Sequence, residues 1–362
     1  MFADLDLSAC ARVVPCADYP RGLVAAAATA PDAPWLYTGG LENHPAIVRR
    51  IAQSRLLWGN GADVIAKIRN PWRVAGELVE RGLPALHVWP RGNSPPDDDG
   101  RWMQKPVRGA AGRGIAVWDR IRAAGKALRE SHYFQEHRGG VPLSALYLGL
   151  PGRTMLLGVT RQLIGLSEVH APPFAWCGTI APASVPAQTQ ATIVQIGEAL
   201  GAWAGLRGLF GCDFLLEAGV PWLTEVNPRY PASTELVEHL LRVPLLEWHR
   251  RACQSLVASP SGGCSGRPPE GGTTSVIGKI ILYARRNATA PDFSRFISRP
   301  TSWMTDGDGT NDTLPYLADI PVAGTRIIAG QPICTLFASA RNDEECLAKL
   351  VRRAARIETR FV

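Results

Sequence analysis

Residues 208–229 read GLFGCDFLLEAGVPWLTEVNPR. Two apolar runs in this stretch flank Glu217–Pro221, a segment with Gly and Pro that is typical of a β-hairpin turn. A hairpin that folds about Gly219 places Asp213 directly opposite Glu225. The stretch therefore predicts two antiparallel strands that bring two carboxylates together.

One face of the predicted hairpin suits a divalent cation. Opposed residues have Cβ atoms roughly 4.5–5.5 Å apart, and two like charges at that distance are destabilising. Asn227 follows Glu225 by two residues and therefore shares its face. Two carboxylates and an amide oxygen form an all-oxygen set, which suits Mg²⁺ that is shared with phosphates. The alternative is a solvent-facing hairpin edge that carries acids without binding metal.

The composition predicts a globular protein with two or three domains, because 362 residues exceed one ordinary core. A hydrophobic fraction of 46% with 20% charged residues excludes wholesale disorder. The net charge is +7, but no aromatic-basic alternation accompanies it, so we expect no nucleic-acid partner.

The cysteine pattern and the apolar runs indicate the compartment. The eight cysteines form no C-x-x-C pair, which argues against a zinc site and a disulfide scaffold and for reduced thiols in a cytoplasm. The segment Met1–Asp6 lacks the basic region and apolar core of a signal peptide. No uncharged apolar run approaches the roughly 18 residues that span a bilayer, so we expect a cytoplasmic protein without a membrane partner.

Four segments follow one another along the chain. Residues 1–92 alternate short apolar runs with helical patterns, which predicts a small parallel α/β domain. Residues 93–258 form an α+β domain that holds the hairpin. Residues 259–274, rich in Ser, Gly and Pro, are a linker, and residues 275–362 form a β-rich domain. We expect helices at 45–54, 71–81, 121–131, 188–206 and from about 343, and strands at 101–107, 115–118, 133–137, 275–284, 325–328 and 332–337.

A second motif precedes the hairpin by about 100 residues. Lys105 stands before the glycine-rich segment Gly109–Gly114. Glycines let backbone N–H groups approach phosphate oxygens, and a lysine supplies a compact charge for them. The segment lacks the Gly-Lys-Ser/Thr of a Walker loop, and alone it fits a plain hairpin equally well. Together with the acidic hairpin it predicts a magnesium–nucleotide site, because magnesium and phosphate binders need each other.

The two motifs together resemble the ATP-grasp superfamily, whose members share a Lys before a Gly-rich loop, a strand that holds adenine and an acidic strand pair ending in E-x-N-P-R. The resemblance covers about residues 98–250. It implies an α/β and α+β ATP-grasp fold with a Rossmann-like N-terminal domain and a small β-rich C-terminal domain. The segments Gly40–Pro45, Arg69–Pro71 and Ala318–Pro321 also resemble ATP-grasp proteins of tetrahydromethanopterin- or methanofuran-linked one-carbon metabolism, a group similar to tyramine–glutamate ligases.

The resemblance implies which residues bind ATP. Lys105 contacts the phosphates, and the glycine loop closes over them. A further cation from the N-terminal domain is either Arg69 or Lys67, and Arg69 is preferred because Asn-Pro follows it. The acid that family members use for ribose has no counterpart here. The implied ATP-binding set is Arg69, Lys105, Gly109, Gly112, Gly114, Gln135, Glu136 and His137.

The same resemblance implies the metal and catalytic residues. Asp213, Glu225 and Asn227 hold Mg²⁺, with Glu225 bridging two ions. Arg229 faces the transferred phosphoryl group or an acyl phosphate, and it acts in catalysis together with Lys105. The implied cofactors are ATP and Mg²⁺, and the expected partners are a small-molecule carboxylate and an amine.

The expected function is that of an ATP-dependent carboxylate–amine ligase, which forms an amide through an acyl phosphate and releases ADP. No Ser/His/Asp or Cys/His signature is recognisable, which agrees with a reaction that needs no enzyme nucleophile. One alternative is a carboxylase component that phosphorylates bicarbonate, like biotin carboxylase. Another is an ATP-binding scaffold or sensor without turnover. A homodimer is one option for the assembly.

Overall fold

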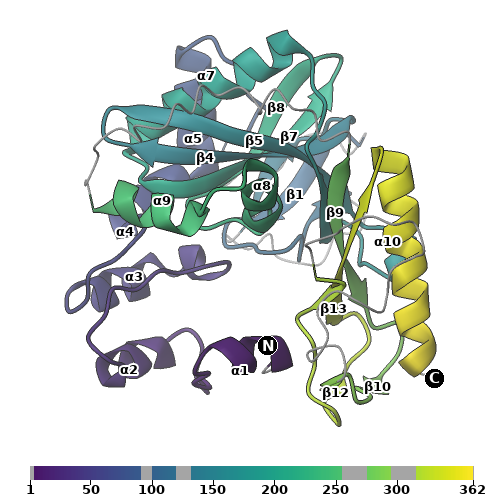
Figure 1. Cartoon of the computed structure of the whole chain (residues 1–362). Helices are drawn as coiled ribbons and strands as arrows, with labels where there is room; N and C mark the ends of the chain where they lie inside the picture. The colour runs from purple at the N-terminus through teal and green to yellow at the C-terminus, as the bar shows by residue number, and fades with distance from the viewer. Residues whose placement is uncertain (1–3, 91–99, 120–131, 255–274, 295–314, 362) are drawn as a thin grey trace. The chain divides into compact units, whose positions relative to one another are not determined.

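The computed structural model of the chain describes residues 4–90, 100–119, 132–254, 275–294 and 315–361 (Figure 1). The helix predicted at 121–131 and the linker predicted at 259–274 lie outside the described residues. The chain divides into two compact units. The larger unit comprises Cys16–Thr160 and Ala183–Glu270, and the smaller unit comprises Met1–Pro15, Arg161–Pro182 and Gly271–Val362. The domain boundaries expected from the sequence stay a prediction.

An antiparallel sheet forms the centre of the larger unit. Its strands lie in the order β5 (Arg153–Ile164, up to Thr160 in this unit), β4 (Val141–Leu150), β7 (Gly208–Glu217) and β8 (Val220–Asn227). β4 pairs with β7, and β7 pairs with β8. From Leu143 on, β4 is buried at every residue, because both faces of the sheet are covered.

Helices pack against both faces of this sheet. Ala145 and Tyr147 of β4 share a core cluster with α7 (Ala187–Ala204). Leu146 and Leu148 alternate with them and pack with α8 (Thr234–Leu241) and α9 (Leu245–Cys253) on the opposite face. The helix predicted at 188–206 is confirmed, since its apolar residues at helical spacing face the sheet.

Close packing of α7 on the sheet predicts a stability effect. A Cβ on Gly197 would overlap the ring of Tyr147, which is fully buried and stacks on Phe210 at 5.0 Å. We expect Gly197→Ala to lower the free energy of unfolding by about 1–3 kcal/mol, measured by urea denaturation. Gly76→Ala is the matched control, because nothing lies within 4 Å of a Cβ at this exposed helical glycine. That control should be neutral or stabilising, and a neutral Gly197→Ala would contradict the packing argument.

A small separate sheet of the larger unit has the order β2 (Ala116–Val117), β1 (Trp102–Pro106) and β3 (His132–Glu136). These strands confirm those predicted at 101–107, 115–118 and 133–137. Lys105 lies opposite Tyr133 in this sheet, and Trp102, Trp118 and Phe134 form an aromatic cluster on it.

The first part of the larger unit is helical, with α2 (Gly22–Thr29), the 3-10 turn η1 (Leu41–Asn43), α3 (Pro45–Ala52), α4 (Ala62–Ile68) and α5 (Pro71–Glu80). The helices predicted at 45–54 and 71–81 are confirmed. The side chain of Asn70 caps α5 by accepting from the Arg73 N–H at 3.1 Å, and Pro71 occupies the first turn. Of the parallel strand pairing predicted for residues 1–92, the described residues show one bridge within this region, between Trp35 and Leu57, and one to β8, between Ala85 and Leu223.

The smaller unit combines a sheet with one long helix. β11 (Leu317–Ala318), β13 (Pro332–Ala340), β9 (Val276–Tyr283) and β6 (Trp176–Ala181) follow one another in the sheet, and β10 (Ala288–Thr289) pairs with β12 (Arg326–Ile327). The remaining elements are α1 (Leu5–Cys10), η2 (Ser167–Val169), α10 (Asp343–Glu358) and η4 (Thr359–Phe361). The three strands and the closing helix predicted for this region are confirmed. No helix within the described ranges has both the length and the apolar character to cross a membrane.

Candidate functional site

A β-bulge sets the register of the acidic hairpin. The turn between β7 and β8 consists of Ala218–Gly219, both at positive φ. A two-residue turn alone would place Asp213 opposite Thr224. The register shifts between Asp213 and the next residue, so that Asp213 faces Glu225 instead. The predicted pairing of the two acids is therefore confirmed, but the extra residue on β8 is its physical cause.

The pKa values of the two acids of the hairpin are shifted in opposite directions. Burial, and then the charge of Glu225, raises the pKa of Asp213 from 3.8 to about 6. Asp213 Oδ2 accepts a hydrogen bond from Asn227 Nδ2 at 3.0 Å, which partly offsets this rise. Burial also opposes ionisation of Glu225, but the charges of Arg69 and Lys105 outweigh it and lower the pKa of Glu225. The site thus holds one firmly ionised carboxylate beside one that resists ionisation.

Arg69 follows α4 and points at the hairpin. Its Nη1 forms an ion pair with Glu225 Oε1, and its Nη2 donates to Asn43 Oδ1 at 3.1 Å and to the Gly109 carbonyl at 3.3 Å. Burial disfavours the charged guanidinium, but Glu225 outweighs burial and raises the pKa of Arg69. Lys67, the other predicted cation, instead lies over the Trp203 ring, 4.4 Å from its centroid.

Arg229 follows β8 and is fixed from three sides. Its Nε donates to Glu42 Oε1 at 3.1 Å, its Nη2 to Asn227 Oδ1 at 3.2 Å and its Nη1 to the Tyr230 carbonyl at 3.3 Å. Its side chain is 18% exposed, whereas that of Glu42 is only 3% exposed. Three hydrogen bonds therefore fix the orientation of the guanidinium, while part of it remains accessible to solvent.

Lys105 crosses from the small sheet to the hairpin. Its Nζ donates to Gln135 Oε1 at 2.9 Å and to the Thr224 carbonyl at 3.2 Å. The bulge at Thr224 turns this carbonyl out of the strand ladder, so that it can accept from the lysine. Lys105 is thereby directed at the same end of the hairpin as Arg69.

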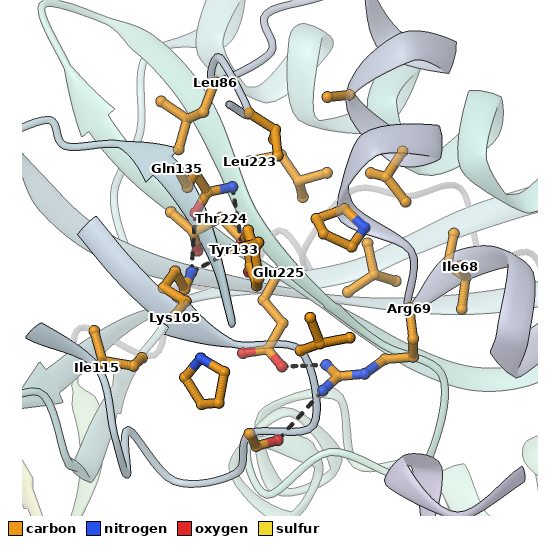
Figure 2. A pocket seen from close by; sticks show the side chains of 18 of the residues that line it. Ile68, Arg69, Leu86, Lys105, Ile115, Tyr133, Gln135, Leu223, Thr224 and Glu225 are labelled. Carbon is orange, nitrogen blue, oxygen red and sulfur yellow. Dashed lines mark hydrogen bonds and ion pairs between the residues drawn. The ribbon is translucent and has the colours of Figure 1, made fainter. Parts of the chain in front are cut away.

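One pocket collects most of the predicted ATP-binding residues. Figure 2 shows Arg69 and Glu225 joined by an ion pair in this pocket, with Lys105 next to Gln135. The lining combines apolar side chains such as Leu86 and Leu223 with the charged groups of Arg69, Lys105 and Glu225, as a nucleotide with an apolar base and charged phosphates requires. The lining includes Ile68, Arg69, Val74, Leu86, Lys105, Gly109, Gly112, Tyr133, Gln135, Leu223, Thr224 and Glu225.

Three residues of the predicted ATP-binding set are not in this lining: Gly114, Glu136 and His137. Glu136 pairs with Arg138 at 2.7 Å and accepts from the His87 N–H at 3.1 Å. The Nδ1 of His137 lies 2.8 Å from the Gly100 carbonyl. Side chains alternate along β3, so when Gln135 points into the pocket Glu136 points away from it.

The sequence reasoning missed two site residues, Glu42 and Asn43. Both lie in the turn η1, are buried and contact the predicted arginines. The signal that could have revealed them is their place in the segment Gly40–Pro45, where a polar pair follows Gly39-Gly40 and Leu41. Among the residues that the structure describes, no three His, Cys, Asp or Glu side chains form a metal cluster. A metal here would have to combine the two acids with the amide of Asn227.

The environment of Lys105 predicts its effect on nucleotide affinity. We expect Lys105→Met to weaken binding of a non-hydrolysable ATP analogue about 10- to 100-fold, because a charge-assisted contact is lost. Titration calorimetry measures the change. Lys67→Met is the matched control, since the Lys67 ammonium donates to the Trp203 carbonyl and lies over the Trp203 ring. This variant should keep nearly full affinity for the nucleotide. Equal losses in both variants would contradict the assignment of the phosphate site to Lys105.

Comparison with known proteins agrees with this geometry. Residues 84–233 match the family model of the ATP-grasp domain. A search of curated proteins finds no match. Among solved structures, the chain is similar to L-amino acid ligase from Bacillus licheniformis, with 18% identity, a TM-score of 0.63, and coverage of 86% of this chain and 76% of that chain.

Two further solved structures share the fold. One is N5-carboxyaminoimidazole ribonucleotide synthetase from Thermotoga maritima, at 14% identity and a TM-score of 0.59, with 86% of this chain and 79% of that chain covered. The other is biotin carboxylase from Campylobacter jejuni, at 13% identity and a TM-score of 0.60, with 91% and 76% covered. The hairpin, the glycine-rich segment and these matches agree: the chain carries an ATP-grasp domain over residues 84–233 and has the mixed α/β fold of the ATP-grasp superfamily.

Proposed function

We propose that this protein is an ADP-forming carboxylate–amine ligase. The observation that carries the proposal is the convergence of Arg69, Lys105 and Glu225 on one pocket, with Asp213 opposite Glu225 on the same hairpin. Two cations beside a pair of carboxylates can bind the phosphates of a nucleoside triphosphate and offset the charge that develops during phosphoryl transfer. The similarity to an L-amino acid ligase supports amide formation as the second half of the reaction.

The hairpin fits Mg²⁺. Burial and Glu225 raise the pKa of Asp213, so the two carboxylates are unfavourable together, and a cation would offset that repulsion. Asp213, Glu225 and Asn227 would hold the metal through oxygens, with Glu225 as the bridge if two ions bind. Bound Mg²⁺ would neutralise part of the triphosphate charge. For Glu225 to ligate metal, Arg69 would exchange its carboxylate partner for a phosphate.

The chain's own residues would act at defined atoms of the substrates. A substrate carboxylate attacks the γ-phosphorus of ATP, and the bond to the bridging oxygen breaks to release ADP. Lys105 and Arg69 bind the phosphate oxygens, and Arg229 stabilises the transferred group through its open N–H groups. An amine then attacks the acyl carbon, phosphate leaves, and the amine loses a proton to give the amide. Closure of the segment Gly109–Gly114 would exclude water from the acyl phosphate.

The decisive experiment measures ADP release by the purified chain against a panel of carboxylates and amines. The panel includes amino acids and pterins, because segments such as Gly40–Pro45 resemble proteins of one-carbon coenzyme metabolism. We expect ADP release that requires both a carboxylate and an amine. ADP release with bicarbonate and without amine would favour the carboxylase alternative, which the similarity to biotin carboxylase supports. Tight ATP binding without turnover under every condition would favour a scaffold or sensor.

We propose a cytoplasmic location, which the proposed use of ATP supports. A homodimer is the assembly to test first, by light scattering of the purified chain.

A further inference from the structure

The turn η1 places two neighbouring polar side chains in the interior of the larger unit. Leu41 anchors the turn, since it is 5% exposed and packs with Tyr37, Val48 and Ile65. The next two residues are Glu42, which is 3% exposed, and Asn43, which is 9% exposed. Burying a carboxylate and an amide is costly unless they have partners, so their partners indicate what the turn does.

Asn43 connects Arg69 to the glycine-rich segment. Its Oδ1 accepts from Arg69 Nη2 at 3.1 Å, and its Nδ2 donates to the Gly109 carbonyl at 3.0 Å. Arg69 Nη2 donates to the same carbonyl at 3.3 Å. The three groups form a closed triangle of hydrogen bonds. A shift of Gly109 would therefore break contacts to both Arg69 and Asn43.

Glu42 holds the other arginine. Its Oε1 accepts from Arg229 Nε at 3.1 Å, while its Oε2 is buried without a hydrogen-bond partner among the described residues. A buried carboxylate with an unsatisfied oxygen is unfavourable, and the charge of Arg229 is its visible compensation. With Asn227 and the Tyr230 carbonyl, Glu42 occupies three of the five guanidinium N–H groups. Two remain without a partner in the described part of the chain and are available to a bound group.

We propose that Glu42 and Asn43 are positioning residues, through which one turn sets the orientation of both arginines of the site and anchors the glycine-rich segment at Gly109. Asn43 acts through Arg69 on nucleotide affinity, and Glu42 acts through Arg229 on phosphoryl transfer. The Glu42 half rests on the proposed ligase function. The Asn43 half requires only that the chain binds nucleotide, so the two halves fail independently.

The first test is a double-mutant cycle on nucleotide affinity. Calorimetry with Mg²⁺ and a non-hydrolysable ATP analogue compares wild type, Asn43→Ala, Arg69→Ala and the double variant. We expect Asn43→Ala to weaken binding about tenfold in the wild-type background and less than about twofold in the Arg69→Ala background. An equal loss in both backgrounds would overturn the positioning role of Asn43.

A second variant keeps this half falsifiable if Asn43→Ala does not fold. Asn43→Asp retains an oxygen for Arg69 but replaces the donor to Gly109 by a carboxylate that repels the carbonyl. We expect faster amide hydrogen exchange in residues 107–115 of this variant, with exchange in α4 unchanged. Unchanged exchange in 107–115 would show that Asn43 does not anchor the segment.

The second test applies the same cycle to Glu42 and Arg229. Glu42→Gln keeps an acceptor oxygen for Arg229 but removes the charge. We expect kcat for ADP release to fall about tenfold while KM for ATP stays within about twofold, and no further fall in an Arg229→Ala background. Glu77→Gln is the matched control, because Glu77 is also a buried glutamate paired with an arginine at 2.5 Å, and its partner Arg81 is not one of the predicted site residues. It should leave kcat unchanged.

The outcomes separate the two proposals. A fall in kcat of Glu42→Gln that persists fully in the Arg229→Ala background would overturn the role of Glu42 as a positioning residue. A wild-type protein that releases no ADP with any substrate would overturn the ligase function and, with it, the Glu42 half. The affinity cycle at Asn43 would still decide the other half, since it needs no turnover.

Discussion

Glu225→Ala is expected to lower ATP-dependent turnover about 10²- to 10³-fold, the cost of removing one essential electrostatic group from a catalytic site. Glu225 is the partner of Arg69 and lies opposite Asp213, so its loss removes a proposed metal ligand and leaves the Arg69 guanidinium without its carboxylate. ADP release under saturating substrates measures the change. Glu225→Gln should show a similar loss, because the amide keeps the shape of the side chain but not its charge.

The same hairpin supplies a matched control. Glu217 also forms an ion pair with an arginine, Arg138, at 3.0 Å. Its side chain is 39% exposed, against 37% for Glu225. It lies beside the turn and outside the pocket lining. Glu217→Ala should therefore keep turnover within about twofold. Comparable losses in the two alanine variants would mean that hairpin stability, rather than the charge at Glu225, limits the reaction.

Asp213→Asn is expected to raise the thermal stability of the metal-free protein while removing its response to Mg²⁺. Burial, and then Glu225, raises the pKa of Asp213 from 3.8 to about 6. Between these two pH values the folded state binds more protons than the unfolded state. The free energy of unfolding therefore falls as pH rises through this window, and the penalty is complete above it. An uncharged Asn escapes the penalty.

Thermal unfolding in EDTA at pH 8 measures this effect, and we expect a rise in Tm of about 2–5 °C for Asp213→Asn. At pH 4 the rise should vanish, because the Asp213 carboxyl is then protonated in the folded protein. Mg²⁺ with an ATP analogue should stabilise the wild type and have little effect on the variant. Asp63→Asn is the control, since Asp63 forms an exposed pair with Arg49. A lower Tm of Asp213→Asn at pH 8 would contradict the argument.

The predicted pairing of Asp213 with Glu225 is correct, but the turn alone does not explain it. A turn centred on Gly219 predicts that Asp213 and Glu225 lie opposite each other. The real turn is Ala218–Gly219, and the bulge at Thr224 restores the pairing. A bulge has no reliable sequence signature, because it depends on which backbone groups find partners outside the strand ladder. Here the Lys105 ammonium is that partner for the Thr224 carbonyl.

The N-terminal region shows the opposite case. The helices predicted at 45–54 and 71–81 are found as Pro45–Ala52 and Pro71–Glu80, because their apolar spacing and the proline after Asn70 are local signals. The short apolar runs that precede these two helices have the same local pattern as true strands. Within the described residues, however, these runs pair with each other through a single parallel bridge, between Trp35 and Leu57. Whether an apolar run joins a ladder depends on a neighbouring strand, and short sequence windows carry no information about that neighbour.

The strand pair, the glycine-rich segment and the identity of the charged groups are predictable from the sequence, because periodicity, turn residues and motif spacing are local properties of the chain. Which of these groups meet depends on the folded structure. It brought Arg69 rather than Lys67 to Glu225, turned Glu136 away from the pocket, and placed Glu42 and Asn43 behind the two arginines. These contacts join residues far apart in the sequence, and their geometry follows from how buried polar groups find partners once the core is packed.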